Sequence, residues 1–381
     1  MTLRLTPPIA LPASVGTILS CLRGADNAAL ETLLRQRFAA ASVSFFNSGR
    51  SALCAQLERW KVAGRDEVVV PAYTCWSVAA SIVRAGLKLS VVDVDPESLD
   101  YDESALEKAL APQTLAVIGT QLFARTANIG RLVTLARPLE IKIVDDAAQA
   151  LPHQPGGADV TLLSFGRGKP IALGGGGALL VHRGHQSDSS LSSSGWLAAG
   201  KLAATTLLAQ PNLYRLPQSL PFLGIGQTEY DPQFERAGTL YDWQRRLGLL
   251  ELERYPEMAA RRSSHADELI AALAPFPSWK LPALERVRLA PLRLPLLAPD
   301  RSSRDRFCER MHTLGVSAVP MYPTALPRIA ALRPHLVTEV DCPGGDELAA
   351  RLVTLPTYPT LSSVDRRRLV QALVTTLEEM H

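Results

Sequence analysis

One lysine of this chain lies in a loop that is unusual for a lysine. In LLSFGRGKPIALGGGGALLV, an apolar run ends at Ser164, and Lys169 follows in a short glycine-containing turn. The glycine run Gly174–Gly177 then precedes another apolar run. A partly desolvated lysine loses proton affinity and becomes a good imine-forming amine. Taken alone, the stretch fits a surface lysine in a glycine-rich turn equally well.

Two aspartates stand where another apolar run ends. The stretch KIVDDAAQAL passes directly from apolar residues to Asp145 and Asp146, and Gln149 follows. Acids at the carboxyl end of a strand are commonly catalytic in open α/β sheets. A carboxylate directed at a protonated pyridine nitrogen would keep that nitrogen cationic, so that the ring withdraws electrons from a substrate carbanion. The alternative is a helix N-cap with a solvated neighbour, and we expect one of the two aspartates to be only that.

A turn of small residues offers a third candidate. Asn47, Ser48 and Gly49 lead into a predicted helix over residues 50–60. Such a turn at a helix N-terminus presents backbone N–H groups and a favourable dipole to a phosphate, and Arg50 and Ser51 could add side-chain contacts. Serine and asparagine are also ordinary N-caps, and this stretch alone favours that interpretation.

Between residues 45 and 185, predicted strands alternate with predicted helices, and these elements must position the residues above. Apolar runs without inside/outside alternation predict a sheet covered on both faces, and helices between them predict crossovers and a mostly parallel sheet. Ligands bind beyond the carboxyl ends of such strands, where the motifs lie. The predicted strands are residues 68–70, 89–94, 115–118, 141–144, 160–163 and 178–181, and the predicted helices are residues 50–60, 76–85, 104–110 and 130–135.

The pattern changes in the second half of the chain. From Asp242, apolar residues at helical spacing predict one long helix with a kink near Pro256, followed by shorter elements. We therefore expect a large domain over residues 1–254 and a smaller one over residues 255–381. The apolar stretch GWLAAGKLAATTLLAQ, from Gly195, is too short for a membrane span and contains Lys201, so we expect a packed helix, with a role at a membrane surface as the alternative. The Ser-rich stretch 186–194 predicts a surface loop.

Composition excludes several classes of protein. The chain has 381 residues, 47% hydrophobic and 20% charged, as in ordinary globular enzymes. With a net charge of +3 and no Lys/Arg-rich run, nucleic acid is not an expected partner. Five widely spaced cysteines and a poor signal peptide predict a reducing cytoplasm. His182 and His185 lack further ligands, so no metal site is expected.

Together the three motifs resemble the DegT/DnrJ/EryC1/StrS aminotransferase family, in register from about residue 45 to 253. SGRSAL at residues 48–53 is similar to the family's SGTSAL, and DDAAQA at residues 145–150 is similar to its EDAAQA. Ser164, Phe165 and Lys169 match its Ser-Phe-x-x-x-Lys motif before a glycine run. The stretches that begin at Val68, Gly119, Met321 and Arg351 also look family-like.

The resemblance implies a fold and a cofactor. The fold is type I α/β, with a mostly parallel seven-stranded central sheet, helices on both faces and a smaller α+β C-terminal domain. The cofactor is pyridoxal 5′-phosphate (PLP), bound as a Schiff base to Lys169, which then acts as general base. Asp146, and not Asp145, would pair with the pyridine nitrogen, and Gln149 would lie near the phenolic oxygen. The phosphate would lie against Ser164 and the residues Gly49, Arg50 and Ser51.

The chain also departs from the family pattern. An aromatic residue usually stacks on the cofactor ring where this chain has Cys75, so Trp76 or Tyr73 would have to replace it. Arg50 replaces a common threonine and could bind the phosphate or reach a substrate anion. Ala237 and Thr239 occupy the Asn and Arg positions of a segment that the family contributes across its dimer interface, while Gln244 matches.

The resemblance implies a homodimeric aminotransferase of polysaccharide biosynthesis. It would move an amino group from glutamate or glutamine to a keto acceptor, in the family a nucleotide-linked keto-sugar. The alternative is a PLP-binding regulatory or non-transaminating family member with a non-sugar substrate. Dehydratase relatives carry histidine in place of the lysine, so Lys169 argues against them. A Rossmann-type enzyme is excluded because no GxGxxG follows the first strand.

Overall fold

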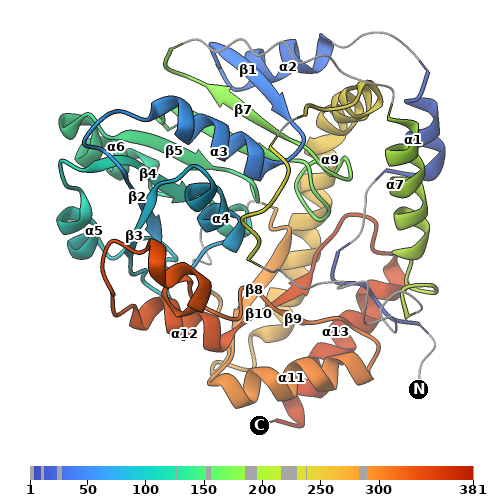
Figure 1. Ribbon diagram of the computed structural model, residues 1–381. Helices are drawn as coiled ribbons and strands as arrows, with labels where there is room; N and C mark the ends of the chain where they lie inside the picture. The colour runs from blue at the N-terminus through green and yellow to red at the C-terminus, as the bar shows by residue number, and fades with distance from the viewer. Residues whose placement is uncertain are drawn as a thin grey trace.

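A computed structural model describes most of the chain (Figure 1). The described ranges are 4–9, 13–23, 28–125, 127–151, 156–184, 195–215, 230–236, 238–282 and 290–380. The Ser-rich stretch 186–194, His185 and Ala237 lie outside these ranges, so the predictions on them stay predictions.

Seven strands form one mostly parallel sheet in the order β1-β7-β6-β5-β4-β2-β3. The neighbours from β3 through β2, β4 and β5 to β6 pair in parallel, whereas β7 runs antiparallel to both β6 and β1. The predicted seven-stranded α/β sheet is therefore confirmed, and β1 is the strand that the apolar runs do not predict. The strands are β1 (Ser42–Phe46), β2 (Glu67–Pro71), β3 (Lys88–Val92), β4 (Thr114–Thr120), β5 (Lys142–Asp146), β6 (Val160–Ser164) and β7 (Gly177–Val181).

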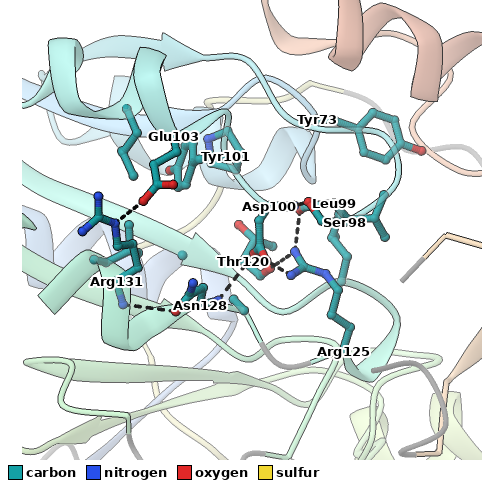
Figure 2. Close-up of a pocket in the computed structure, with 16 residues that line it drawn as sticks. Tyr73, Ser98, Leu99, Asp100, Tyr101, Glu103, Thr120, Arg125, Asn128 and Arg131 are labelled. Carbon is teal, nitrogen blue, oxygen red and sulfur yellow. Dashed lines mark hydrogen bonds and ion pairs between the residues drawn. The ribbon is translucent and has the colours of Figure 1, made fainter. Parts of the chain in front are cut away.

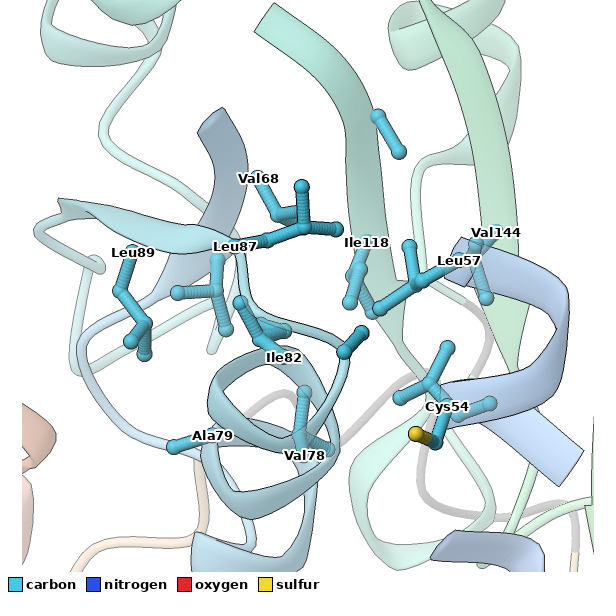
Figure 3. Close-up of a cluster of buried hydrophobic side chains, with 14 of the residues drawn as sticks. Cys54, Leu57, Val68, Val78, Ala79, Ile82, Leu87, Leu89, Ile118 and Val144 are labelled. Carbon is cyan, nitrogen blue, oxygen red and sulfur yellow. The ribbon is translucent and has the colours of Figure 1, made fainter. Parts of the chain in front are cut away.

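Helices cover both faces of this sheet. Successive residues of each strand point to opposite sides, so both faces of the sheet carry apolar side chains that the helices bury. Val68 and Val70 of β2 belong to a buried cluster with Leu57 of α3 (Gly49–Trp60) and Ile82 of α4 (Trp76–Arg84), which Figure 3 shows. Val69 points the other way and belongs to a cluster with residues of α5 (Glu103–Ala109) and α6 (Ile129–Ala136). Burial on both faces explains why the strands lack polar alternation.

A smaller antiparallel sheet, ordered β8-β10-β9, forms the C-terminal part together with three helices. Its buried cluster is formed by side chains from the strands, from α11 and α13, and from the end of α9. This arrangement confirms the expected smaller α+β part. The strands are β8 (Arg293–Leu297), β9 (Val319–Pro320) and β10 (Leu352–Pro356), and the helices are α11 (Arg301–Thr313), α12 (Pro343–Arg351) and α13 (Ser363–Glu378).

One long helix, α9 (Asp242–Leu273), joins the two sheets and continues through Pro256, as predicted. Trp243 and Leu247 are buried in a cluster against the large sheet, whereas Leu269 lies in the cluster of the small sheet. The expected boundary between residues 254 and 255 falls inside this helix, and the division into two domains there stays a prediction. The other helices of the described ranges are α1 (Val15–Ser20), α2 (Ala29–Arg37), α7 (Trp196–Leu208), η1 (Leu122–Ala124), η2 (Arg137–Leu139), η4 (Leu326–Arg328) and η5 (Ala330–His335).

The apolar stretch after Gly195 forms the predicted helix, α7, but the expectation that it is packed is wrong for most of its length. Only Ala199 and Leu202 are buried, whereas Trp196 and Leu197 are 66% and 68% exposed. In Figure 1, α7 lies beside α1 at the rim of the molecule, so the rest of the fold covers one side of it. Within the described ranges, no helix has both the length and the apolar character that a membrane crossing requires.

Candidate active site

Lys169 lies in the tight loop between β6 and β7. Its backbone N–H donates to the carbonyl oxygen of Gly166 at 3.3 Å, and Gly168 adopts a φ of 69°. A Cβ at Gly168 would approach the Ile9 side chain to 2.9 Å, so both conformation and space require a glycine there. The Lys169 side chain is half-buried at the carboxyl edge of the sheet, as the lysine motif predicts.

Asp146 ends β5 at the same edge of the sheet where Ser164 ends β6. It is 3% exposed, and its Oδ1 accepts a hydrogen bond from the Ala148 N–H at 3.1 Å. Burial raises the pKa of Asp146, and the positive charge of Lys169 opposes that rise. The lysine is therefore within electrostatic reach of this carboxylate, although Asp146 ends β5 and Lys169 lies in the loop after β6.

Asp145 points to the opposite side of β5 and is not the solvated helix cap that the sequence analysis expects for one of the pair. It is 1% exposed, and it accepts hydrogen bonds from Gln121 Nε2 at 2.5 Å and from Thr161 Oγ1 at 3.4 Å. Burial raises the pKa of Asp145 to about 7. The alternation of side chains along a strand therefore separates the two aspartates, with Asp146 on the side of Lys169.

Replacing Asp145 by asparagine is expected to remove part of the pH dependence of stability. The pKa of Asp145 is about 7 in the folded chain and near 4 when unfolded, so the folded state holds its proton more tightly. Stability is then lost as the pH rises through this window, by up to about 3 kcal/mol between pH 5 and pH 8. Urea unfolding of both proteins at the two pH values measures the difference. The same pH dependence in the variant would contradict this assignment.

Gln149 is fixed by two partners from distant parts of the chain. Its Nε2 donates to the Tyr322 hydroxyl at 2.7 Å, and its Oε1 accepts from the Phe123 N–H at 3.1 Å. Tyr322 is 4% exposed and lies within electrostatic reach of Asp146 and Cys75. The MYPTAL segment thus brings a tyrosine into contact with a predicted site residue.

The small-residue turn meets Ser164 at the start of α3. Ser48 is the N-cap: its Oγ accepts from the Ser51 N–H, and Ser51 Oγ accepts from the Ser48 N–H, both at 3.1 Å. A Cβ at Gly49 would lie 3.4 Å from Ser164 Cβ, an ordinary contact distance, so the first residue of α3 lies next to the end of β6. A Cβ at Gly177 would come within 2.6 Å of the Gly49 backbone nitrogen, which explains a glycine at the start of β7. Ser51 is thus both a capping residue and part of the predicted phosphate turn.

The Arg50 side chain is held by residues that the sequence analysis does not single out. Its guanidinium carbon lies 5.2 Å from the centre of the Phe234 ring, and its Nη1 lies 3.9 Å from Asp231 Oδ2. The side chain is 35% exposed. Its contact with a phosphate stays a prediction, and a substrate anion could compete with Asp231 for it.

The two candidates for the stacking aromatic lie in different surroundings. Tyr73 is 1% exposed, donates from its hydroxyl to the Met321 carbonyl oxygen and packs edge-on against Tyr322, with ring centres 5.7 Å apart. Trp76, the first residue of α4, is half-buried, and its Nε1 donates to the Thr324 carbonyl oxygen at 3.0 Å. Because Tyr73 is already enclosed by protein, Trp76 is the aromatic we keep as the stacking prediction.

Gln244 supports the glycine run before β7. Its Nε2 donates to the carbonyl oxygens of Leu173 and Gly175 at 3.0 and 3.2 Å, and its Oε1 accepts from the Tyr241 N–H. Thr239 Oγ1 accepts from Arg245 at 3.3 Å. The residues that a partner subunit would contribute stay untested.

Two residues near the site are absent from the predicted set, Tyr214 and Arg293. Tyr214 lies within electrostatic reach of Arg167 in the lysine loop and of Arg293, the first residue of β8. Arg293 is also within reach of Tyr322. A single arginine at the start of a strand has no sequence signal, because its significance depends on elements that meet it only in the folded chain.

A cavity of about 230 Å³ lies beside this site, towards α5 and α6, and is lined by neither Lys169 nor Asp146 (Figure 2). The buried Arg125 lines this cavity and donates to Asp100 Oδ1 at 2.6 Å and to the Leu99 carbonyl oxygen at 2.5 Å. These bonds fix the loop after β4, which carries Phe123 and so positions Gln149. Arg125 is therefore a structural support in this chain.

The sheet order and the lysine loop at the sheet edge define the class: an α/β transferase of fold type I. The solved Streptococcus pneumoniae protein Spr1654, in its PLP form, superposes with a TM-score of 0.76 over 99% of each chain at 21% identity. The chain belongs to the DegT/DnrJ/EryC1/StrS aminotransferase family, whose model matches residues 17–374. The predicted fold and family are thus confirmed.

Two characterised relatives show what the chain is similar to. L-glutamine:2-deoxy-scyllo-inosose aminotransferase of Micromonospora echinospora is 30% identical over 65% of this chain, and the match spans 59% of that protein's own length. UDP-N-acetyl-3-dehydro-α-D-glucosamine 3-aminotransferase of Acidithiobacillus ferrooxidans is 24% identical over 87% of this chain and 83% of its own length.

Proposed function

We propose that this chain is a PLP-dependent aminotransferase that moves an amino group from glutamate or glutamine to a keto group on a sugar or cyclitol. The observation that carries the proposal is the position of Lys169 within electrostatic reach of the buried Asp146, at the sheet edge where Ser164 meets the start of α3. A lysine on a remote surface turn would not lie within electrostatic reach of this buried carboxylate.

The described residues fit the cofactor. Ser164 at the end of β6 lies next to Gly49 at the first turn of α3, where backbone N–H groups lack acceptors within the helix and attract a phosphate. Asp146 would hold the ring nitrogen, Gln149 the phenolic oxygen, and Lys169 the aldehyde carbon. When bound, the cofactor supplies an electron-withdrawing ring and a carbon that exchanges an amino group.

The chain's own groups then hold and move protons. Asp146 is buried away from water, so a cationic partner would strongly stabilise its negative charge. The hydrogen bond from the Ala148 N–H fixes the orientation of the carboxylate. The amine of Lys169 lies within electrostatic reach of Asp146, and in each half of the reaction it would move a proton between the substrate carbon and the cofactor. Gln149 cannot turn away, because Tyr322 and Phe123 hold both ends of its amide.

The relatives support the substrate class. One takes its amino group from L-glutamine and acts on a keto-cyclitol, and the other acts on a nucleotide-linked keto-sugar. Both acceptors are polyhydroxylated rings that carry a ketone. For this chain we propose the nucleotide-linked keto-sugar as acceptor, since the match with that relative spans more of both chains.

Amino transfer with a substrate panel tests the proposal. Glutamate and glutamine are each offered as donor, with UDP- and dTDP-linked keto-sugars and scyllo-inosose as acceptors, and the products are identified by mass spectrometry. We expect at least one nucleotide-linked keto-sugar to be aminated, with parallel double-reciprocal lines because covalent exchange occurs in two halves. A cofactor-loaded protein that transfers no amino group from any amino acid would overturn the proposal and favour a regulatory role.

A further inference from the structure

The outer side of α7 carries most of the large apolar residues of this helix. Trp196 and Leu197 at its start are 66% and 68% exposed, and Leu207 and Leu208 at its end are 47% and 42% exposed. Eleven residues make about three turns of an α-helix, so Trp196 aligns with Leu207 and Leu197 aligns with Leu208. These four side chains therefore form one apolar stripe, which we call the α7 patch.

Exposed apolar side chains gather around this stripe. Within the described ranges, eleven large hydrophobic side chains are exposed, and seven of them lie on α1, on α7 or in the turns that follow these two helices. Leu19 and Leu22 of the α1 segment are 50% and 38% exposed, and α1 lies beside α7 (Figure 1). Single exposed apolar residues need no explanation, whereas a gathering of them marks a surface for a protein partner or a membrane.

The inner side of α7 is fixed to the fold. Trp243 of α9 donates from Nε1 to the carbonyl oxygen of Gly195, directly before the helix, at 3.2 Å. In the middle of the helix, Leu202 is buried against the glycine run before β7, where a Cβ at Gly174 would approach the leucine to 2.8 Å. The inner side thus has its contacts within the fold, so the outer side is the one available to a partner.

The charges near the α7 patch all have the same sign. Residues 13–25 and 189–228 contain no aspartate or glutamate, although the whole chain has 37 of them. The charged residues of these two stretches are Arg23, Lys201 and Arg215. Arg23 and Lys201 are exposed, and in the described part of the chain neither pairs with a carboxylate. Cations beside an apolar surface are complementary to the headgroups of anionic lipids.

The same charges disfavour a second copy of the chain as the partner. A two-fold contact uses the same patch on both subunits, so it would place two positively charged, acid-free surfaces opposite each other. A lipid surface supplies the opposite charge, and a tryptophan such as Trp196 suits the boundary between headgroups and acyl chains. The 13 residues of α7 extend over about 20 Å. That length is too short to cross a bilayer core of about 30 Å, so the helix would lie along the surface.

We propose that α7 docks the protein on the surface of an anionic phospholipid membrane. The α7 patch enters the region between the headgroups and the acyl chains, and the long side chain of Lys201 reaches the lipid phosphates. The attachment is peripheral and reversible, because one short helix buries few apolar side chains.

The test is co-sedimentation of the PLP-loaded full chain with lipid vesicles. One set of vesicles is phosphatidylcholine alone, and the other is an equal mixture of phosphatidylcholine and phosphatidylglycerol. We expect the mixture to bind about 10-fold more tightly or better, and added salt to weaken that binding by screening the charges. The double variant Trp196→Ser/Leu197→Ser should bind the mixture about 10- to 100-fold more weakly, since two large apolar side chains no longer leave water.

A matched control and a charge variant sharpen the test. Val62 and Leu139 are 55% and 44% exposed and lie outside α1 and α7, so the double variant Val62→Ser/Leu139→Ser should bind as wild type does. Lys201→Glu keeps the α7 patch and reverses one charge, so it should weaken binding to the mixture about 10-fold and leave binding to phosphatidylcholine nearly unchanged. Circular dichroism spectra and melting temperatures equal to those of wild type would show that each variant is folded.

Three results would overturn the proposal. The first is a wild-type protein that does not sediment with the phosphatidylglycerol vesicles at low salt. The second is an equal loss of binding in the Val62→Ser/Leu139→Ser control. The third is a Trp196→Ser/Leu197→Ser variant that binds vesicles as wild type does but forms a smaller oligomer in light scattering, which would make a second copy of the chain the partner of the α7 patch.

Discussion

Replacing Lys169 by alanine is expected to lower the rate of amino transfer by at least about 10³-fold, within the range for loss of a general base. The side chain is half-buried in a loop that glycines hold in place, and it is the amine within reach of Asp146. Borohydride reduction of the wild-type protein, followed by peptide mass mapping, should locate the cofactor on Lys169. Single-turnover kinetics with glutamate measures the loss in the variant.

The matched control for this prediction is Lys201→Ala. Lys201 is exposed on α7, away from the described site residues, so its removal should leave both rate and labelling unchanged. An unchanged circular dichroism spectrum and melting temperature of Lys169→Ala without cofactor would show that the fold survives. Amino transfer by Lys169→Ala at the wild-type rate would refute the assignment of the lysine.

Replacing Asp146 by asparagine is expected to reduce kcat by about 10²- to 10³-fold, the scale for loss of one preorganised electrostatic contact in a site that excludes water. Asparagine keeps the shape and the acceptor for the Ala148 N–H, so the change isolates the charge. Without that charge a pyridine nitrogen loses its counter-ion. The absorbance spectrum of the bound cofactor should shift, and steady-state kinetics measures the rate.

Asp145→Asn is the control beside it in the sequence. Asp145 faces the other side of the strand from Asp146. Its partners, Gln121 and Thr161, are not among the predicted cofactor-binding residues. The kcat of Asp145→Asn should stay within a few-fold of wild type, while the stability of this variant should depend less on pH than that of wild type, as described above. A larger loss of activity in Asp145→Asn than in Asp146→Asn would exchange the roles of the two aspartates.

Much of the fold is predictable from local sequence. The five parallel strands and their helices are visible because burial on both faces requires long apolar runs separated by helical periodicity. β1 is missed because its sequence, SVSFF, alternates serine with apolar residues, although all five residues are buried. The sequence predicts the helix α7 but not its exposure, since an apolar sequence does not indicate which neighbours will cover the helix.

The features of the candidate site also fall into those that the sequence determines and those that depend on the tertiary structure. The sequence alone determined the family and the nature of the reactive groups, because a lysine loop, a strand-end acid and a small-residue turn each need specific residue types at fixed spacing. Only the tertiary structure decided that Asp146 lies within electrostatic reach of Lys169 while Asp145 accepts a hydrogen bond from Gln121, that Tyr73 is enclosed, and that Arg293 lies within electrostatic reach of Tyr322. The physical reason is that spacing along the chain fixes which residues a loop contains, whereas the side of a strand and the approach of a second sheet are set by packing between elements far apart in sequence.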